Sequence, residues 1–268
     1  MKRVSLPLWL VSAFIYIFMY APIVVVIVFS FNAAKYGGPW RGFTTDWYAT
    51  LMHSPDKIVA TKNTVILAVA STIIATTLGT GLGYGLSRYS FPGKKLFSLL
   101  MYIPVMIPDI VMAVAMLAFF NILSQAITLL SIGMTTMIIA HVTFQIPFVA
   151  IVVRSRLVGM DPAIEEAAHD LGADAWRTFW HVTFPLMVPG VLAGAMLAFT
   201  LSLDDFVVSF FTTGPGATTL PILIYSSVKR GITPDINALS TLIVLASVVG
   251  TIGVTLLQQP HQPSGGKP

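Results

Sequence analysis

Apolar residues occur along this chain in six long runs, at about 8–30, 63–87, 96–122, 134–153, 186–211 and 236–257. Each run approaches the roughly 20 residues that an α-helix needs to cross a bilayer. The pattern therefore predicts an all-α integral membrane protein with six transmembrane helices. Residues 1–257 are expected to form a single transmembrane domain, and the polar residues 258–268 a disordered C-terminal tail.

The composition agrees with a protein dissolved in lipid. Of the 268 residues, 56% are hydrophobic and only 10% are charged, against roughly 25% charged in an average soluble domain. Too few polar side chains remain to cover such an apolar interior in water. The chain has no cysteine, which excludes disulfides and thiolate chemistry. Its net charge of +4 is spread along the sequence, so no nucleic-acid partner is expected.

The first apolar run is predicted to be a retained helix. It extends from Leu8 to Phe31, which is too long for the core of a cleavable signal peptide. Lys and Arg are more frequent in the loops on the N-terminal side of the membrane than in the opposite loops, which predicts that both termini are cytoplasmic. After this run, residues 46–52 are expected to form a short interfacial helix with Thr44 or Thr45 as its N-cap.

The long hydrophilic loop at about 154–189 is predicted to begin with a short helix. Asp161 is a good N-cap, and the following proline suits the first helical position. Glu165 and Glu166 then lie near the positive end of that helix. Gly172 can end the helix by adopting a left-handed conformation.

A second short helix is predicted after this glycine. Asp174 is its expected cap, and the helix would carry Trp176, Phe179 and Trp180. These aromatic side chains exceed what an idle solvated loop exposes.

This loop carries a family resemblance. Glu166-Ala167-Ala168, followed by Gly172, Phe184-Pro185 and Pro189, resembles the "EAA" loop of ABC importer permeases, with Phe184 where the family commonly has Leu. The resemblance implies a MetI-like type I importer permease fold whose loop docks into a cytoplasmic ATPase dimer. ATP and Mg would then be bound by that ATPase, with no cofactor in this chain. The implied coupling residues are Glu165, Glu166, Ala167, Ala168, Gly172 and Trp176.

A closer resemblance extends over most of the chain, from Leu8 to about Gly250. Three segments, Asp204-Asp205-Phe206, Gly214 to Pro221 and Pro234 to Ala238, resemble the spermidine/putrescine permeases, although their usual basic tail is missing. This resemblance implies a heterodimer with a sister permease in the bacterial inner membrane. It also implies an ATPase dimer inside and a periplasmic or surface-tethered polyamine-binding protein outside.

Three acidic residues lie inside the predicted spans, namely Asp109, Asp204 and Asp205, with no Lys or Arg beside them in the spans. Ionisable residues are costly in a membrane and are therefore candidates for a substrate pathway. Unneutralised carboxylates suit a polycation. Pro104 and Pro108 are expected to break the third helix, as in transporter helices that line substrate sites. Pro108 and Asp109 also suit the N-terminus of the outer half-helix, a role compatible with the first.

Asp204 and Asp205 are predicted to have different roles. Adjacent helical residues point about 100° apart, so only one of the two is expected to face substrate. The other is expected to bond the loop from Gly214 to Pro221, and the sequence does not select between them. Phe206, Phe210 and Phe211 are candidates for cation–π contacts to an ammonium group, and the alternative is that these rings pack against lipid or the core.

Two further patterns predict helix packing. His141 and Gln145 are four residues apart, and interhelical hydrogen bonds are their expected role. Two Gly-x-x-x-Gly pairs, 79/83 and 81/85, allow a second backbone to approach closely, either within the chain or from another subunit.

The predicted function is that of a transport subunit rather than an enzyme. The sequence has no phosphate-binding Gly-x-x-x-x-Gly-Lys loop, no His-Glu-x-x-His and no Gly-x-Ser-x-Gly. The favoured hypothesis is a polyamine importer permease that works by alternating access. Alternatives are the same permease type for ferric ion, thiamine or a phosphonate, and a stand-alone ion-coupled transporter with the aspartates as proton sites. A membrane enzyme is the remotest alternative.

Overall fold

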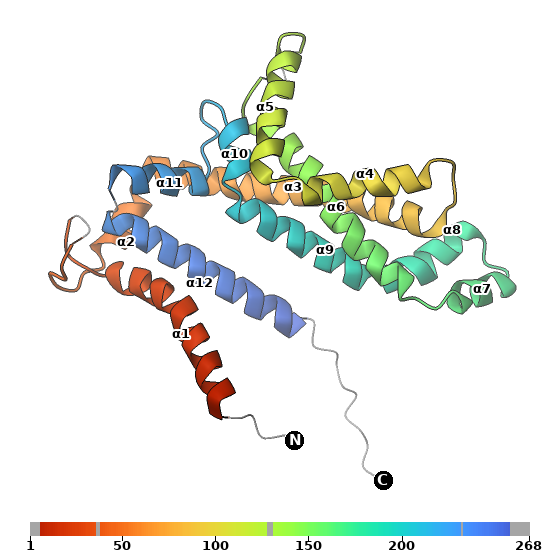
Figure 1. Ribbon diagram of the computed structural model, residues 1–268, viewed down its shortest axis with the longest axis horizontal. Helices are drawn as coiled ribbons and strands as arrows, with labels where there is room; N and C mark the ends of the chain where they lie inside the picture. The colour runs from red at the N-terminus through yellow and green to blue at the C-terminus, as the bar shows by residue number, and fades with distance from the viewer. Residues whose placement is uncertain (1–5, 36–37, 128–130, 232, 258–268) are drawn as a thin grey trace. The chain divides into compact units, whose positions relative to one another are not determined.

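The computed structural model describes residues 6–35, 38–127, 131–231 and 233–257 (Figure 1). Helices account for all of its regular elements, apart from one isolated bridge between Asn32 and Phe43. The all-α class predicted from the sequence is therefore confirmed for the described residues. The predicted tail at 258–268 lies outside them.

The helices follow one another along the chain. They are α1 (Leu6–Phe29), α2 (Asp46–Met52), α3 (Pro55–Arg88), α4 (Lys94–Met106), α5 (Asp109–Ser124), α6 (Met134–Val158), α7 (Ala163–Asp170), α8 (Ala175–Thr178), the π-helical segment Phe179–Thr183, α9 (Phe184–Asp204), α10 (Val207–Thr212), α11 (Leu220–Arg230) and α12 (Pro234–Leu257).

Six transmembrane helices are not established by the described residues. Four stretches are long and apolar enough to cross a membrane, namely α1, α3, α6 and the continuous helix Ala175–Asp204. The number rises to five when α4 and α5 count as one broken span. In α12 the apolar stretch Pro234–Val249 is shorter than a full span, and the side chains beyond it are not described.

The predicted break in the third apolar run is confirmed. Between α4 and α5 the helix axis turns by 106°. Ile107 and Pro108 both have a ψ angle of 134°, which is extended backbone. Proline has no backbone N–H and disfavours helical backbone in the residue before it, so α4 stops at Met106 and a new helix starts at Asp109.

The fifth predicted span, 186–211, is wrong at both ends. Helix α9 ends at Asp204, and Asp205 has extended backbone at φ −64° and ψ 120° before α10 begins. At its other end α9 continues backwards through the π-helical segment into α8. The second loop helix is therefore the start of a long helix rather than a separate element.

The chain forms two compact units. The first contains the described residues up to Ile58 and those from Ile224 onwards. In it α1 and α2 pack against α12, and Lys57 forms an ion pair with Asp235 at the start of α12. The predicted short helix at 46–52 is confirmed as α2, and Thr44 Oγ1 accepts a hydrogen bond from the N–H of Asp46 at 3.1 Å.

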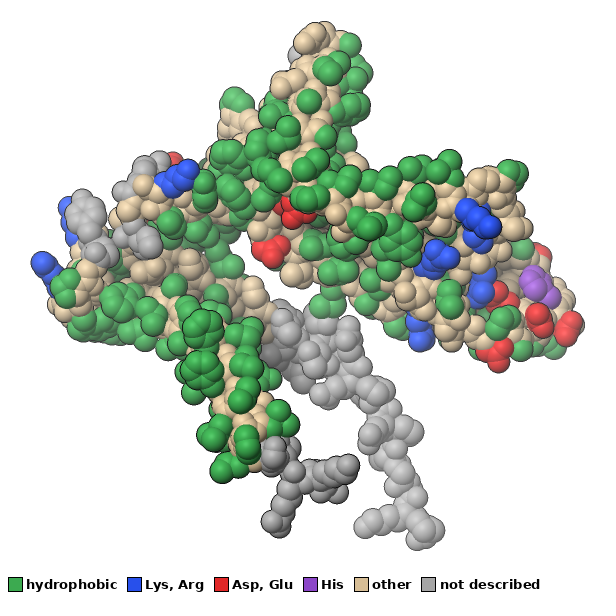
Figure 2. Space-filling model, viewed as in Figure 1, with side chains coloured by type: hydrophobic (Ala, Val, Ile, Leu, Met, Phe, Trp, Pro, Cys, Tyr) green, Lys and Arg blue, Asp and Glu red, His purple; other side chains and the backbone are tan. Residues whose placement is uncertain are grey.

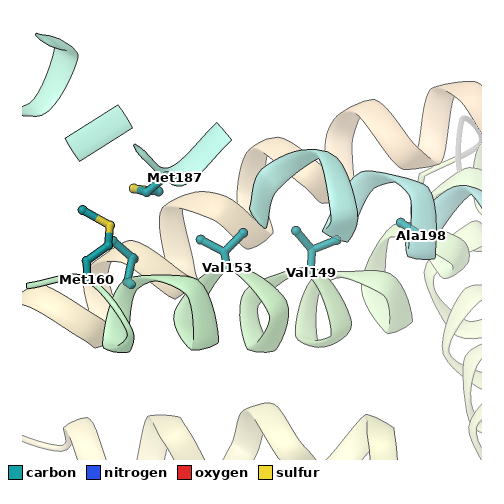
Figure 3. Close-up of a cluster of buried hydrophobic side chains, with 6 residues drawn as sticks. Val149, Val153, Met160, Met187 and Ala198 are labelled. Atoms are coloured by element: carbon teal, nitrogen blue, oxygen red, sulfur yellow. The ribbon is translucent and has the colours of Figure 1, made fainter. Parts of the chain in front are cut away.

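The second unit, Val59–Leu223, is built around α6 and α9. Figure 3 shows the side chains that join them: Val149 and Val153 from α6, Met187 and Ala198 from α9, and Met160 just beyond α6. Figure 2 shows hydrophobic side chains over α4 and α5, whereas charged side chains gather around α7 and α8.

One of the two predicted glycine pairs packs inside this unit. A Cβ atom added at Gly79 would lie 2.7 Å from Cβ of Val149, and one added at Gly83 would lie 2.8 Å from the backbone oxygen of Ala150. These glycines let α3 approach α6 closely. A Cβ at Gly81 or Gly85 would meet no atom of the described residues within 4 Å, so this second pair makes no such close approach within the described part of the chain.

Candidate functional site

Asp109 lies at the break between α4 and α5. It is the first residue of α5 and is exposed. A carboxylate is favoured at this end of a helix, because the unpaired backbone N–H groups there carry partial positive charge. Both expectations for this residue, a place at a helix start and an accessible carboxylate, are therefore compatible with the structure.

Asp204 and Asp205 are placed in different environments. Asp204 is the last residue of α9 and is exposed. Asp205 is turned inward, and its side chain is only 11% exposed. Its carboxylate accepts hydrogen bonds from the N–H groups of Val208 at 3.2 Å and Ser209 at 2.7 Å. The expectation that both residues share one helix is wrong, because the helix ends between them.

The partner of Asp205 is also not the predicted one. Its carboxylate lies 3.3 Å from Nε2 of His141 and against the start of α10, rather than bonding the loop from Gly214 to Pro221. His141 is fully buried, at 0% exposure. Its Nδ1 lies 2.8 Å from Oγ of Ser202, and its Nε2 lies 3.0 Å from Oγ of Ser209.

Gln145 extends this buried polar network toward α3. Its side-chain N–H donates to Oγ of Ser71 at 3.3 Å and to the backbone oxygen of Ala198 at 3.1 Å. Ser71 in turn donates to Ser202 at 3.3 Å. The predicted interhelical hydrogen bonds of His141 and Gln145 are therefore confirmed, and they connect α3, α6, α9 and α10.

The phenylalanines after Asp205 have separate surroundings. Phe206 is half-buried, and its ring centroid lies 5.3 Å from that of Phe210, which is exposed. Phe211 packs into a hydrophobic cluster formed by α5, α6 and α10. This cluster joins α10 to the helix that begins with Asp109. Figure 2 shows acidic side chains on the surface near the foot of α5.

The loop that follows α10 is held in place by the N-terminal part of α3. The side-chain amide of Asn63 donates to the backbone oxygens of Gly216 at 2.8 Å and Thr218 at 3.0 Å. Thr64 Oγ1 accepts from the N–H of Leu220 at 2.8 Å. Gly214 lies so close to Ile132 that an added Cβ would be 2.1 Å from the Ile132 oxygen, so only glycine fits there.

The polar loop has the predicted capping interactions. The carboxylate of Asp161 accepts from the N–H of Ala163 at 3.0 Å, and that of Asp174 accepts from the N–H of Arg177 at 2.8 Å. Gly172 has φ +82°, the left-handed conformation expected at the end of α7. The α7 bounds begin one residue later than predicted, at Ala163.

Adjacent glutamates on α7 point to different partners. Glu165 is half-buried and accepts hydrogen bonds from Arg88 at 3.0 Å and from Thr183 at 2.7 Å. Glu166 and Ala167 are exposed, and Ala168 is half-buried. Trp176 is 71% exposed, and its ring centroid lies 5.7 Å from that of Trp180.

Several polar residues that position these sites were not predicted. They are Asn63, Ser71, Arg88, Thr183, Ser202 and Ser209. The sequence feature that could have predicted some of them is a small polar side chain within an apolar run, as at Ser71 and Ser202. Such residues in membrane helices commonly hydrogen-bond across helices.

These features define a class of protein: a multi-pass membrane transport subunit with broken helices and a folded polar loop. Residues 75–264 match the family described as "Binding-protein-dependent transport system inner membrane component". The chain belongs to this family, so it is an inner-membrane transport subunit.

The chain resembles several named relatives along most of its length. It is 40% identical to the spermidine/putrescine transport system permease protein PotC of Shigella flexneri, over 94% of both chains. It is 41% identical to the putrescine transport system permease protein PotI of Escherichia coli (strain K12), over 88% of this chain and 84% of that protein.

Solved structures share the fold. A chain of a bacterial alginate ABC transporter, in complex with an alginate pentasaccharide-bound periplasmic protein, superposes with a TM-score of 0.74 at 20% identity, covering 95% of this chain and 94% of that one. A chain of the MetNI methionine ABC transporter gives 0.61 at 20% identity, covering 81% and 98%. The predicted ABC permease fold is therefore confirmed, without a count of six spans.

Proposed function

We propose that this chain is the permease subunit of an ATP-driven ABC importer that carries polyamines such as spermidine and putrescine into the cell. The observation that carries the proposal is the exposure of two carboxylates, Asp109 and Asp204, at two separate helix breaks. Polyamines have several ammonium groups, and accessible carboxylates within a membrane pathway attract such groups. The similarity to PotC and PotI supports the same substrate class.

The acidic residues have distinct roles in this proposal. Asp109 and Asp204 accept ammonium groups of the substrate, and Phe206 contributes a cation–π contact near them. Asp205 does not contact substrate, because its carboxylate is held by α10 and His141. The proposal therefore assigns the substrate contact to Asp204 rather than to Asp205.

The polar loop couples transport to ATP hydrolysis in this proposal. Glu166, Ala167, Ala168 and Trp176 form the surface that meets a cytoplasmic ATPase dimer, which binds ATP and Mg. Glu165 and Gly172 hold the shape of α7 behind that surface. A sister permease completes the membrane pathway, a periplasmic or surface-tethered binding protein delivers the polyamine, and both termini of this chain are cytoplasmic.

The test is uptake of labelled spermidine and putrescine into proteoliposomes that contain the chain and its co-purified partner subunits. Uptake should require ATP and should fall about tenfold or more in Asp109→Asn and Asp204→Asn, as expected when a charged contact is removed. Asp56→Asn, which changes an exposed carboxylate at the start of α3, is the matched control and should transport normally.

Two outcomes would contradict parts of the proposal. If the complex assembles and hydrolyses ATP but moves neither polyamine, the substrate class is wrong. If uptake proceeds without any ATPase subunit, the chain is not part of an ABC importer and a stand-alone transporter is the better description.

A further inference from the structure

The two neighbouring aspartates owe their different exposure to the backbone between them. Helix α9 ends at Asp204, and Asp205 takes an extended conformation with φ −64° and ψ 120°. The chain then turns into α10 at Val207. Whether Asp204 remains accessible therefore depends on what keeps this break in its present shape.

The break is held by contacts to the side chain of Asp205. Its two carboxylate oxygens accept the N–H groups of Val208 and Ser209, which lie in the first turn of α10, where backbone N–H groups have no helical partner. A further contact comes from His141 on α6, whose Nε2 lies 3.3 Å from Oδ2 of Asp205. Asp205 thus binds both the new helix and a helix from elsewhere in the unit.

His141 contacts both sides of the break. Its Nδ1 meets Ser202 in the last turn of α9, and its Nε2 meets Ser209 in α10. An imidazole ring offers a donor on one nitrogen and an acceptor on the other, and serine hydroxyls accept either arrangement. Because the ring is fully buried and both nitrogens are engaged, rotation of α10 against α9 would require breaking these bonds.

The same ring is anchored to the remainder of the unit. Ser202 is linked through Ser71 to Gln145, which also bonds the backbone of Ala198. Helix α10 is packed in turn against α5, the helix that starts with Asp109, through a cluster that includes Val208 and Phe211. The position of His141 therefore influences α9, which ends with Asp204, and, through α10, also α5, which starts with Asp109.

We propose that His141 is a positioning residue for substrate recognition: by binding Asp205, Ser202 and Ser209, it fixes the α9–α10 break so that Asp204 faces the substrate pathway. This inference rests on the proposed function for the identity of the pathway. His141 acts without touching substrate, and it also sets how Asp204 is placed relative to Asp109. It therefore contributes to the choice among polyamines of different length.

The first test uses uptake kinetics of the assembled complex. His141→Leu fills a similar volume without hydrogen bonds, whereas His141→Gln keeps one donor and one acceptor. The leucine variant should raise KM for polyamine by about tenfold with less change in the maximal rate, and should alter the spermidine-to-putrescine preference. The glutamine variant should restore most of the affinity.

Thr143→Ala provides the matched control for these variants. Thr143 lies on the same helix and is exposed, and among the described residues its hydroxyl bonds only the Ile139 oxygen of its own helix, at 2.7 Å. Removal of the Thr143 hydroxyl should leave both the KM for polyamine and the spermidine-to-putrescine preference unchanged. If His141→Leu prevents assembly, Ser209→Ala removes one partner of the ring and should shift KM in the same direction. An unchanged KM in the leucine variant, or in Ser209→Ala in its place, would overturn the proposal.

The second test measures the position of residue 204 without transport. Because the chain has no cysteine, Asp204→Cys introduces a single thiol. A water-soluble cationic methanethiosulfonate should modify this thiol readily in the assembled complex. The rate should fall about tenfold with His141→Leu, because residue 204 would no longer be held facing the water-filled pathway, and should recover with His141→Gln.

The two tests separate the inference from the function on which it rests. If the modification rate follows the variants but no polyamine is transported, His141 positions residue 204 and the substrate class is wrong. If uptake falls in His141→Leu while the modification rate is unchanged, the positioning role is refuted. If the thiol at position 204 does not react even when His141 is unchanged, Asp204 does not lie in a water-filled pathway. That result would refute this inference as well.

Discussion

The carboxylate of Glu165 accepts a hydrogen bond from the guanidinium of Arg88 at 3.0 Å, which ties α7 to the last turn of α3. The same oxygen accepts from Thr183 at 2.7 Å, at the junction of the π-helical segment and α9. One side chain therefore connects the polar loop to two long helices. A displacement of α7 would be transmitted to both of them through this carboxylate.

Glu165→Ala should lower the stability of the chain, whereas Glu166→Ala should not. The first change leaves Arg88 and Thr183 without their partner, which costs about 2 kcal/mol for hydrogen bonds to a charged group. Glu166 is exposed, so its removal should weaken only binding to the ATPase subunit. Thermal unfolding in detergent and co-purification of the ATPase measure the two effects. Equal melting temperatures for both variants would contradict the role of Glu165.

Gly172→Val should uncouple ATP hydrolysis from transport, and Gly172→Asn should do so much less. At φ +82° a β-branched residue is strained by about 1–2 kcal/mol, whereas asparagine tolerates this conformation. No atom of the described residues lies within 4 Å of an added Cβ, so backbone strain separates the variants. The measurement is polyamine transported per ATP hydrolysed. Normal coupling in the valine variant would show that the turn after α7 is not required.

Gly79→Ala should destabilise the chain, and Gly81→Ala should leave it as stable or slightly more so. A Cβ at Gly79 would lie 2.7 Å from Val149 and 2.9 Å from the Ile146 oxygen, and such overpacking costs about 1–3 kcal/mol. A Cβ at Gly81 meets nothing within 4 Å, and alanine is the better helix former by about 0.8–1 kcal/mol. Melting temperatures of the two variants in detergent should therefore move apart. A loss of stability at Gly81 would indicate a contact with another subunit.

Asn63→Ala should loosen the loop between α10 and α11 without unfolding the bundle. The change removes the two hydrogen bonds that hold the backbone oxygens of Gly216 and Thr218. Hydrogen exchange should become about tenfold faster in this loop and stay unchanged in α6, because the loss is local. Thr77→Ala, which removes a hydroxyl that bonds its own helix, is the control. Uniform acceleration across α6 and the loop would indicate global destabilisation instead.

Much of the architecture is determined by local features of the sequence. Long apolar runs require helices in lipid, because no water is available there to satisfy backbone polar groups. The bend after Met106 follows from the prolines beside it, and the caps at Asp161, Gly172 and Asp174 follow from side chains that bond or shape the adjacent backbone. Such effects act within a few residues, so the sequence pattern is sufficient to predict them.

The tertiary structure decided which member of each similar pair has which partner. Glu165 but not Glu166 meets Arg88, and Gly79 but not Gly81 meets α6. Asp205, directly after the end of α9, meets His141, which lies more than sixty residues earlier in the chain, whereas Asp204 stays exposed. Neighbouring residues of the same type cannot be distinguished by their sequence pattern alone. They differ only once helices pack, because packing determines which side of each helix meets a neighbour and which carboxylate finds a partner.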